Sequence, residues 1–246
     1  NKLEFFILGN GSNLLVSDKG YRGVVIQLWK NFSDIETEDN TITVKAGALL
    51  SKVAAEALEE SLTGMEFASG IPGTMGGAVM MNAGAYGGEM KDIIREVTVL
   101  TREGELLTLS KEEMNFGYRT SVVKEKGYVV ISAELQLRKG DREEIRKVMD
   151  ELKERRVTKQ PLDMPSAGST FKRPEGYFAG KLIMDAGLRG FSVGGAQISE
   201  KHCGFVVNKG DATAADVLGL IGEVQKRVQE KFGVALEPEV KFLGEF

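Results

Sequence analysis

GIPGTMGGAVMMNAGAYGGE is the stretch from Gly70 to Glu89, and seven of its first nineteen residues are glycine. It holds too few serines and charges for a flexible linker. Glycine at this density lets the backbone approach a ligand closely and lets N–H groups converge on an anion. The stretch therefore favours a loop that holds a phosphate-bearing ligand. A tightly packed connection without a ligand is the alternative.

Apolar patterns on either side of this stretch predict strands and helices. Runs of β-branched or alternating residues predict strands, and apolar residues three and four apart predict helices. Before the stretch, we expect strands at 4–8, 14–16, 24–28 and 41–46 and a helix at 50–58. After it, we expect strands at 97–100, 106–109 and 128–137, with a hairpin turn at 102–104.

The second half begins with the clearest helix, at 141–156, which follows the candidate boundary Lys139-Gly140-Asp141. Residues 161–174 show neither a helical nor a strand period. Further on, we expect a helix at 178–186 that is ended by Gly187. A second helix should begin at a capping box of Thr213 and Asp216 and end near Gly233. Strands are expected at 191–198, 204–207 and 240–243. The predicted class is α+β, in two halves.

Composition narrows the class of protein. The chain has 246 residues, 42% hydrophobic and 28% charged, which is typical of a soluble globular protein of one or two domains. A net charge of −4 gives no basic footprint for nucleic acid. No apolar run approaches the roughly 20 residues of a membrane span. We therefore expect neither a nucleic-acid nor a membrane partner.

Cysteine usage and the first residue bear on the compartment. Cys203 is the only cysteine, so no internal disulfide can form, which suits a reducing compartment and predicts a cytoplasmic protein. No signal peptide is visible. The sequence opens without Met, so we expect its N-terminus to be incomplete.

Several kinds of catalytic site are disfavoured. His202 is the only histidine, so a serine hydrolase would depend on His202 with Ser169, which does not lie in a G-x-S-x-G elbow. His202 and Cys203 alone cannot complete a zinc site, so no metal is expected. The G-x-x-x-x-G-K-[ST] pattern of P-loop proteins is absent.

Three short polar clusters could carry chemistry. Tyr118 and Arg119 lie in a loop, residues 167–174 place a hydroxyl and two cations after a glycine, and residues 236–240 place carboxylates before an apolar strand. Each could equally be a solvated surface feature. Residues 9–13, Gly-Asn-Gly-Ser-Asn, could be a tight hairpin turn or a second ligand loop.

Six motifs in order resemble the UDP-N-acetylenolpyruvoylglucosamine reductase family. They are LGNGSNLLV (8–16), GIPGTMGGAVMMNAGAYGGE (70–89), FGYRTS (116–121), PSAGSTFKRP (165–174), GGAQISEKHCGFVVN (194–208) and LEPEV (236–240). The resemblance covers nearly the whole chain. No long insertion bearing a tyrosine separates the 141–156 helix from Pro165, so the chain resembles the shorter, second type of the family.

The resemblance implies a two-part FAD-binding domain of the PCMH/vanillyl-alcohol-oxidase type and a C-terminal α+β substrate domain. The first FAD subdomain would comprise 1–46 and 238–246, lacking its N-terminal part, and the second would comprise 47–139. The substrate domain would comprise 140–237. A monomer is expected.

The implied activity is reduction of UDP-N-acetylglucosamine enolpyruvate to UDP-N-acetylmuramate for peptidoglycan synthesis, and so for the cell wall, cell shape and cell division. NADPH would reduce FAD, which passes hydride to the terminal carbon of a vinyl ether, because no side chain donates hydride. Arg119 would grip the substrate carboxylate, protonated Glu239 would donate to the same oxygens, and Ser169 would give the proton.

The resemblance also implies two sets of binding residues. Those around FAD would be Gly9, Asn10, Gly11, Ser12, Asn13, Gly70, Ile71, Pro72, Gly73, Gly76, Gly77, Asn82, Ala83, Gly84, Ala85 and Tyr86. Those around the substrate would be Tyr118, Arg156, Lys159, Gly168, Lys172 and Arg173. Arg173, Lys159 or Tyr177 would meet the substrate diphosphate in place of the missing tyrosine.

Two other classes of function stay open beside this one. One is an FAD oxidase or dehydrogenase on the same cofactor fold with another substrate. The other is a non-catalytic module that binds a nucleotide sugar.

Overall fold

A computed structural model of the chain describes residues 3–246, which divide into two compact units. The first unit is the chain up to Gly11 together with Val24–Arg156, and the second is Ser12–Gly23 together with Val157–Phe246. Neither unit is one continuous piece of chain. In the described residues, no helix combines the length and apolar character that crossing a membrane requires.

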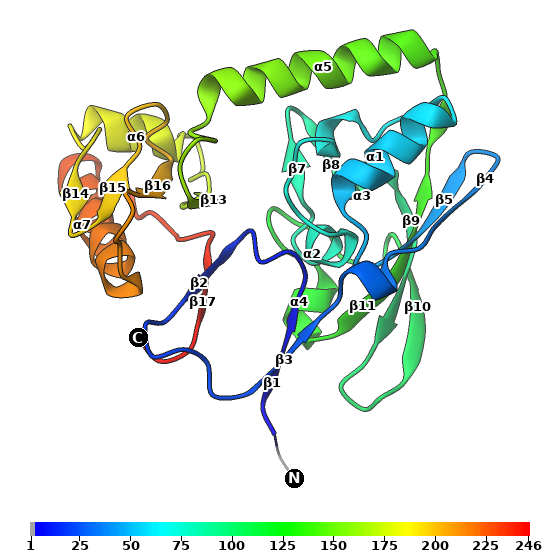
Figure 1. The fold of residues 1–246 in the computed structure, drawn as a ribbon, viewed down its shortest axis with the longest axis horizontal. Coiled ribbons are helices and arrows are strands. Elements are labelled where there is room, and N and C mark those ends of the chain that lie inside the picture. The colour runs from blue at the N-terminus through cyan, green and yellow to red at the C-terminus, as the bar shows by residue number, and fades with distance from the viewer. Residues whose placement is uncertain (1–2) are drawn as a thin grey trace. The chain divides into compact units, whose positions relative to one another are not determined.

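The first unit is built on a five-stranded antiparallel sheet in the order β10-β9-β11-β5-β4 (Figure 1). Val97 and Val99 on β9 and Ile42 and Val44 on β5 alternate into the core and are fully buried. Helix α2 packs on β11. The bounds are β4 Ile35–Glu38, β5 Thr41–Lys45, β9 Ile94–Leu100, β10 Leu106–Ser110, β11 Val129–Gln136, α1 Leu50–Glu59, α2 Met75–Met80, α3 Met90–Ile93 and α4 Val122–Lys126.

Three two-stranded pairs complete the first unit. Strands β1 Phe5–Leu8 and β3 Val24–Gln27 pair in parallel, while β6 Leu62–Thr63 pairs with β12 Arg138–Lys139 and β7 Gly84–Ala85 with β8 Gly88–Glu89. Short 3-10 turns occupy Lys30–Phe32 and Glu66–Ala68. The chain passes from the first unit to the second within helix α5 Arg142–Lys159.

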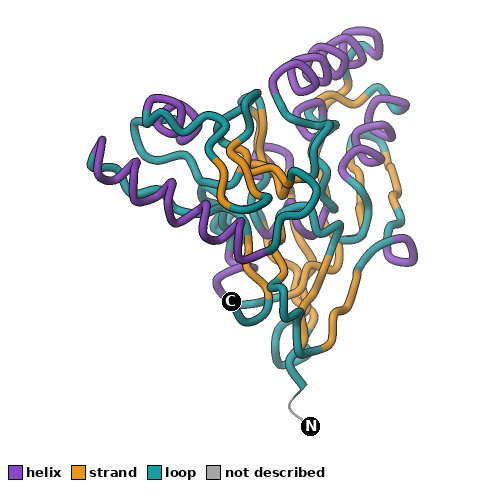
Figure 2. The backbone as a smooth tube through the Cα atoms, turned by 60° about the vertical axis from the view of Figure 1, so that its left-hand side comes forward, coloured by secondary structure: helices purple, strands orange, loops and turns teal. Residues whose placement is uncertain are grey.

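The second unit contains a four-stranded antiparallel sheet in the order β13-β16-β15-β14 and a separate parallel pair, β2 with β17. Leu220, Ile221, Val224 and Val228 of α7 pack into its core. Both long helices, α5 and α7, are unbroken coils in Figure 2. The bounds are β2 Leu14–Val16, β13 Ser166–Ser169, α6 Ala179–Asp185, β14 Ser192–Val193, β15 Ala196–Ile198, β16 Phe205–Asn208, α7 Ala214–Phe232 and β17 Lys241–Leu243.

The patterned elements agree with the sequence. Thr213 and Asp216 form the predicted capping box, and α7 ends at Gly233, whose φ of 69° is left-handed. A hairpin turn between β9 and β10 is closed by the amide of Thr101, which donates to the carbonyl of Glu105 over 2.8 Å. The α+β class is confirmed by the mixture of sheets and helices.

Several expectations were wrong. The glycine-rich stretch is not all loop, because it contains α2 and the β7–β8 ribbon. Residues 9–13 are not a hairpin turn, since β1 pairs with β3 and β2 pairs with β17. The run 191–198 is two strands around Gly194 and Gly195. Strand β13 lies in 161–174, and β4 and α4 were not predicted, because each is too short to show a period.

Candidate functional site

Five glycines of the first unit leave little room for a side chain, although at Gly70 the nearest atoms belong to the flexible side chain of Arg156. A Cβ on Gly70 would lie 2.7 Å from Nε of Arg156, and one on Gly76 would lie 3.0 Å from Cβ of Ala46. Both distances are shorter than ordinary contacts, so any side chain there would displace a neighbour. Three other glycines are restricted in the same way. A Cβ on Gly9 would press on Thr74, and one on Gly88 would press on Phe67. A Cβ on Gly84 would press on Glu89 and on the carbonyl of Gly88.

Two other glycines of this stretch have no such reason within the described chain. The nearest atoms to a Cβ on Gly73 or Gly77 would be 3.8 Å away, and neither residue has a left-handed φ. Gly77 even lies in α2, where glycine costs about 0.5–1 kcal/mol relative to alanine. The backbone at Gly73 and Gly77 therefore forms a cradle, a surface without side chains whose space a Cβ would reduce. Such a surface fits a ligand such as FAD that lies against the backbone.

The loop of residues 9–11 borders the same stretch. Asn10 donates from Nδ2 to the carbonyl oxygen of Pro72 over 2.8 Å, and Gly9 packs on Thr74. The structure thus brings this part of the predicted cofactor set together. Ser12 and Asn13 belong to the second unit, where Nδ2 of Asn13 donates to the carbonyl of Glu239 over 3.2 Å.

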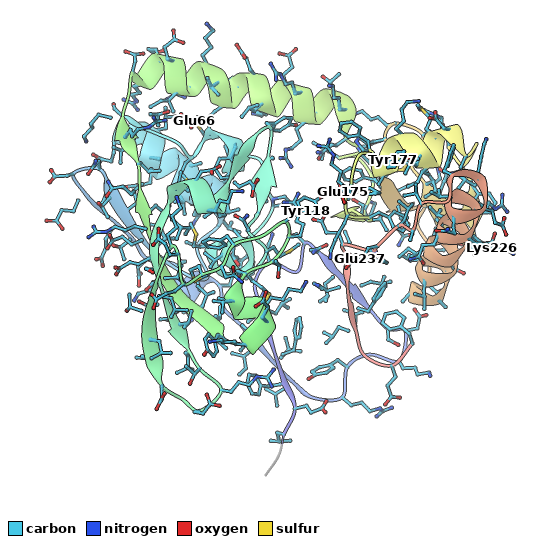
Figure 3. The ribbon with its side chains drawn as sticks, turned by 180° about the vertical axis from the view of Figure 1, so that it is seen from behind. Glu66, Tyr118, Glu175, Tyr177, Lys226 and Glu237 are labelled. Carbon is cyan, nitrogen blue, oxygen red and sulfur yellow. The ribbon has the colours of Figure 1, made fainter. Side chains whose placement is uncertain are left out.

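Arg119 sits at the corner of a tight turn. The amide of Gly117 donates to the carbonyl of Thr120 over 3.1 Å, and Arg119 has a φ of 55°, which is uncommon outside glycine and asparagine. Its Nη2 donates to the carbonyl of Gly84 over 3.3 Å. Exposed Tyr118, marked in Figure 3, lies 5.2 Å from the guanidinium carbon. The turn presents a fixed cation beside the glycine-rich ribbon.

Arg156 also lies against the glycine-rich stretch. Its guanidinium carbon is 5.8 Å from the ring of Tyr86, a residue with a φ of 53°, and its Nε faces Gly70. Burial lowers the pKa of Arg156, and Tyr86 opposes that shift. The predicted substrate residue Lys159, three positions further on, belongs to the second unit.

Ser169 is presented by a β-bulge in the second unit. Ser166 pairs with Val207 and Ser169 with Phe205, so β13 carries one extra residue. Gly168 has a φ of 81°, which glycine adopts readily. Bulges re-aim side chains near active sites, and here the bulge leaves Ser169 exposed at the end of its strand.

The segment that carries Glu239 runs beside Ser169. The amide of Lys172 donates to the carbonyl of Glu237, and Phe171 bridges Pro238. Lys172 forms an ion pair with Glu237, whose carboxylate is labelled in Figure 3. The structure therefore brings Ser169, Lys172 and Glu239 into one part of the second unit.

The loop before α6 holds the remaining predicted cation. Arg173 donates from Nε to the carbonyl of Tyr177 over 3.2 Å, and its guanidinium carbon lies 4.0 Å from the ring centre of Phe178. Tyr177 and Phe178 are exposed. This loop offers one cation and two aromatic faces to a ligand.

His202 is placed poorly for a serine hydrolase. Its Nδ1 accepts a hydrogen bond from the amide of Gly204 over 3.1 Å. In a catalytic triad, Nδ1 of the histidine instead carries a proton and donates it to a carboxylate. Burial lowers the pKa of His202 and the charge of Lys159 acts in the same direction, while a hydrogen bond within the residue's own backbone opposes them. The described residues contain no group of three or more His, Cys, Asp or Glu suited to a metal.

Two residues of this region were missed from the sequence. Ser121 is fully buried, and its Oγ donates to the carbonyl of Met80 over 2.9 Å. Glu89 accepts from Nδ2 of Asn82 over 2.6 Å. Both belong to the motifs that carry the resemblance, so membership of a motif was the only available signal.

Comparisons with known proteins agree with this geometry. A family model for an FAD binding domain matches residues 1–110, and one for the C-terminal domain of UDP-N-acetylenolpyruvoylglucosamine reductase matches residues 160–243. Curated proteins of the latter name from Agathobacter rectalis and Clostridioides difficile are 62% and 57% identical, over 98% and 99% of this chain and 80% of each relative.

A solved structure is similar as well. The crystal structure of UDP-N-acetylenolpyruvylglucosamine reductase from Thermus caldophilus has a TM-score of 0.85 and 41% identity to this chain. The similarity covers 99% of this chain and 87% of that one.

Proposed function

Since this chain belongs to the UDP-N-acetylenolpyruvoylglucosamine reductase family, we propose that Arg119, Ser169 and Glu239 are its catalytic residues. The chain is an FAD-dependent oxidoreductase that uses NADPH to reduce UDP-N-acetylglucosamine enolpyruvate to UDP-N-acetylmuramate. This reaction serves peptidoglycan synthesis, and so the cell wall, cell shape and division. When bound, FAD that has been reduced by NADPH would supply the hydride that reduces the double bond.

Arg119 binds the substrate carboxylate in the proposed mechanism. Reduction at the terminal carbon pushes negative charge into that carboxylate, so the transition state carries more charge there than the substrate does. A guanidinium is always protonated and can hold both oxygens at once. The turn and the hydrogen bond to Gly84 hold Arg119 in place before the substrate binds, so less conformational entropy is lost during the reaction. This preorganisation supports the role.

Ser169 holds the proton that the carbon next to the carboxylate receives. Serine is a weak acid, but the reduced intermediate is strongly basic. The observation that carries this assignment is the bulge at Gly168, which leaves the hydroxyl exposed beside the Glu239 segment. We assign to Glu239 a protonated carboxyl that donates to the substrate oxygens, and to Lys172 a cation that eases proton loss.

For FAD, we propose a backbone site formed by residues 9–13 and the glycine-rich stretch. Gly73 and Gly77, where a Cβ would make only ordinary contacts with the protein, support close approach of the cofactor. Hydrogen exchange measured with and without FAD tests the assignment, and protection is expected at residues 70–86. Protection absent there would refute it.

For the substrate, we propose as contacts Tyr118 and Arg156 of the first unit, and Lys159, Gly168, Lys172 and Arg173 of the second. Lys159 and Arg173 are assigned to the diphosphate, and the aromatic faces of Tyr177 and Phe178 support a nucleotide beside Arg173. Charge reversal at either cation should raise the KM for the nucleotide sugar more than it lowers kcat. An unchanged KM would remove that residue from the site.

We also propose subdomains at 1–46 with 238–246, at 47–139 and at 140–237, a monomer, and a cytoplasmic location. The family models at 1–110 and 160–243 support a cofactor-binding part followed by a substrate-binding part, and the single buried thiol of Cys203 suits a reducing compartment. Light scattering of the flavin-bound protein tests the oligomeric state, and cell fractionation tests the location. A mass of twice 26.8 kDa would refute the monomer.

One experiment tests the whole proposal. Anaerobic NADPH should bleach the flavin spectrum of the FAD-loaded protein, and the enolpyruvyl nucleotide sugar should restore it. Oxygen consumption with no response to the nucleotide sugar would favour a different FAD oxidase. Binding of the nucleotide sugar without oxidation of NADPH would favour a non-catalytic module.

A further inference from the structure

Asn82 lies two residues after the end of α2, is 1% exposed and has a φ of 43°. Its Nδ2 donates to Oε2 of Glu89 over 2.6 Å and to the carbonyl oxygen of Gly117 over 3.1 Å. Its Oδ1 accepts from the amide of Lys91 over 2.9 Å. A carboxamide has two N–H hydrogens, and both are used here within the protein. The side-chain nitrogen is therefore committed to shaping the fold around it.

The two acceptors of Asn82 flank Arg119. Gly117 opens the turn that carries Arg119, and its amide and carbonyl both bond to Thr120. Glu89 pairs on the β7–β8 ribbon with Gly84, and Gly84 accepts the hydrogen bond of Arg119. One buried amide thus joins the turn that carries Arg119 to the side chain of Glu89, which pairs with the residue that Arg119 contacts.

A second buried side chain fixes the other end of the turn. Ser121 follows the turn, and its Oγ donates to the carbonyl of Met80. Both ends of the turn are therefore attached to the C-terminal end of α2. Anchors of this kind are what a left-handed φ at Arg119 requires, because such a conformation persists only where the surroundings determine it.

We propose that Asn82 is a positioning residue that holds Arg119 in register with the substrate carboxylate, through its hydrogen bond to Gly117. This inference rests on the proposed role of Arg119. It gives the side chain of Asn82 a task different from direct contact with FAD.

The first test replaces Asn82 by a residue of the same shape without donors. In Asn82→Asp, an oxygen takes the place of Nδ2 and faces the oxygens of Glu89 and Gly117. Displacement of a catalytic group by about 1 Å can cost about 100-fold in rate, so we expect kcat for the enolpyruvyl substrate to fall by about that factor. Reduction of FAD by NADPH should fall much less than product formation, because that half-reaction does not use Arg119.

A double variant separates positioning from folding. When Asn82→Asp is combined with Glu89→Gln, the carboxamide introduced at position 89 can donate to the carboxylate introduced at position 82. This restores a hydrogen bond between positions 82 and 89 with donor and acceptor exchanged. The carbonyl of Gly117 still lacks the hydrogen bond that Asn82 donates in the parent. We expect the melting temperature to recover while product formation stays low. The amides of 116–121 should also exchange hydrogen faster than in the parent. Recovery of product formation together with stability would overturn the proposal.

A cycle with Arg119→Ala separates this inference from the proposed function. If Asn82 acts through Arg119, Asn82→Asp should lower kcat much less in the Arg119→Ala protein than in the parent. Full additivity would overturn the inference while leaving the role of Arg119 intact. Normal product formation by Arg119→Ala alone would instead refute the proposed function.

Discussion

The backbone nitrogen of Glu239 donates a hydrogen bond of 2.8 Å to the carbonyl oxygen of Thr170, the residue that follows Ser169. Thr170 is buried, and its Oγ1 accepts from the amide of Val206. The backbone segments that carry the two proposed catalytic residues of the second unit are therefore joined by a hydrogen bond, although 70 positions separate these residues in the sequence. Substitution of either side chain should change chemistry without unfolding the unit.

Ser169→Ala should stop product formation and leave the first half-reaction intact. Loss of a positioned proton donor typically costs about 10²–10⁴-fold in rate, and we expect a loss in this range. Stopped-flow absorbance measures flavin reduction by NADPH and its reversal by the nucleotide sugar separately. Ser192→Ala, at an exposed position of β14 in the same unit, is the control and should keep both rates. Equal loss of both half-reactions in Ser169→Ala would rule out proton donation.

Gly77→Ala should weaken FAD binding and leave the FAD-free protein as stable as before or more stable. Its Cβ would meet no protein atom closer than 3.8 Å, and alanine is favoured over glycine in a helix by up to about 1 kcal/mol. Fluorescence titration with FAD and thermal unfolding of the FAD-free protein check the two effects.

The neighbouring change Gly76→Ala is the matched control. Its Cβ would press on Ala46, and overpacking of this kind costs about 1–3 kcal/mol, so the FAD-free protein itself should lose stability. If Gly77→Ala binds FAD as tightly as the parent does, the cradle lies elsewhere.

Arg119→Ala should lower turnover far more than flavin affinity. The guanidinium is proposed to meet the substrate, and its bond within the protein goes to a ribbon carbonyl. Arg119→Lys should recover little activity, since an ammonium cannot hold two carboxylate oxygens in the same plane. Steady-state kinetics and an FAD titration on each variant check this. Release of FAD by Arg119→Ala would show that the residue is structural.

Asp216 should make the second unit sensitive to acid. Hydrogen bonds from the amide and hydroxyl of Thr213, and from the amide of Gly195, lower the pKa of Asp216 below its ordinary value. A lowered pKa in the folded state stabilises the protein above the ordinary pKa of aspartate, and the effect disappears as pH falls through the lowered value. The melting temperature of Asp216→Asn should therefore lie below that of the parent at pH 7. The two should converge in acid, and a constant difference would contradict the assignment.

Much of this fold could be predicted from local pattern. The helix 214–232 has an apolar stripe, a capping box and a terminal glycine, so three independent signals agree. Strand β13 has only four residues, two of them serine and one the bulged Gly168, and no period can show in so short a run. Its strand character comes from pairing with β16, which lies more than 35 residues away.

The site could be predicted only in part. The density of glycine indicated a backbone cradle, but the sequence does not distinguish Gly76, which packs on Ala46, from Gly77, where a Cβ would meet no protein atom closer than 3.8 Å. Asn82 was assigned to the cofactor by its motif. Its hydrogen bonds to Glu89 and Gly117 depend on tertiary structure that no local pattern reports.

The pairing of β2 with β17 sets an order of events during synthesis. Asp18, just after β2, accepts hydrogen bonds from the amides of Ala214 and Ala215, so residues 12–23 find their partners only near the other end of the chain. The sheet of the first unit needs nothing beyond β11. On the ribosome that sheet can form early. Residues 12–23, in contrast, find their partners only after about 200 further residues have been synthesised. Until the second unit folds, this segment stays exposed to chaperones and proteases.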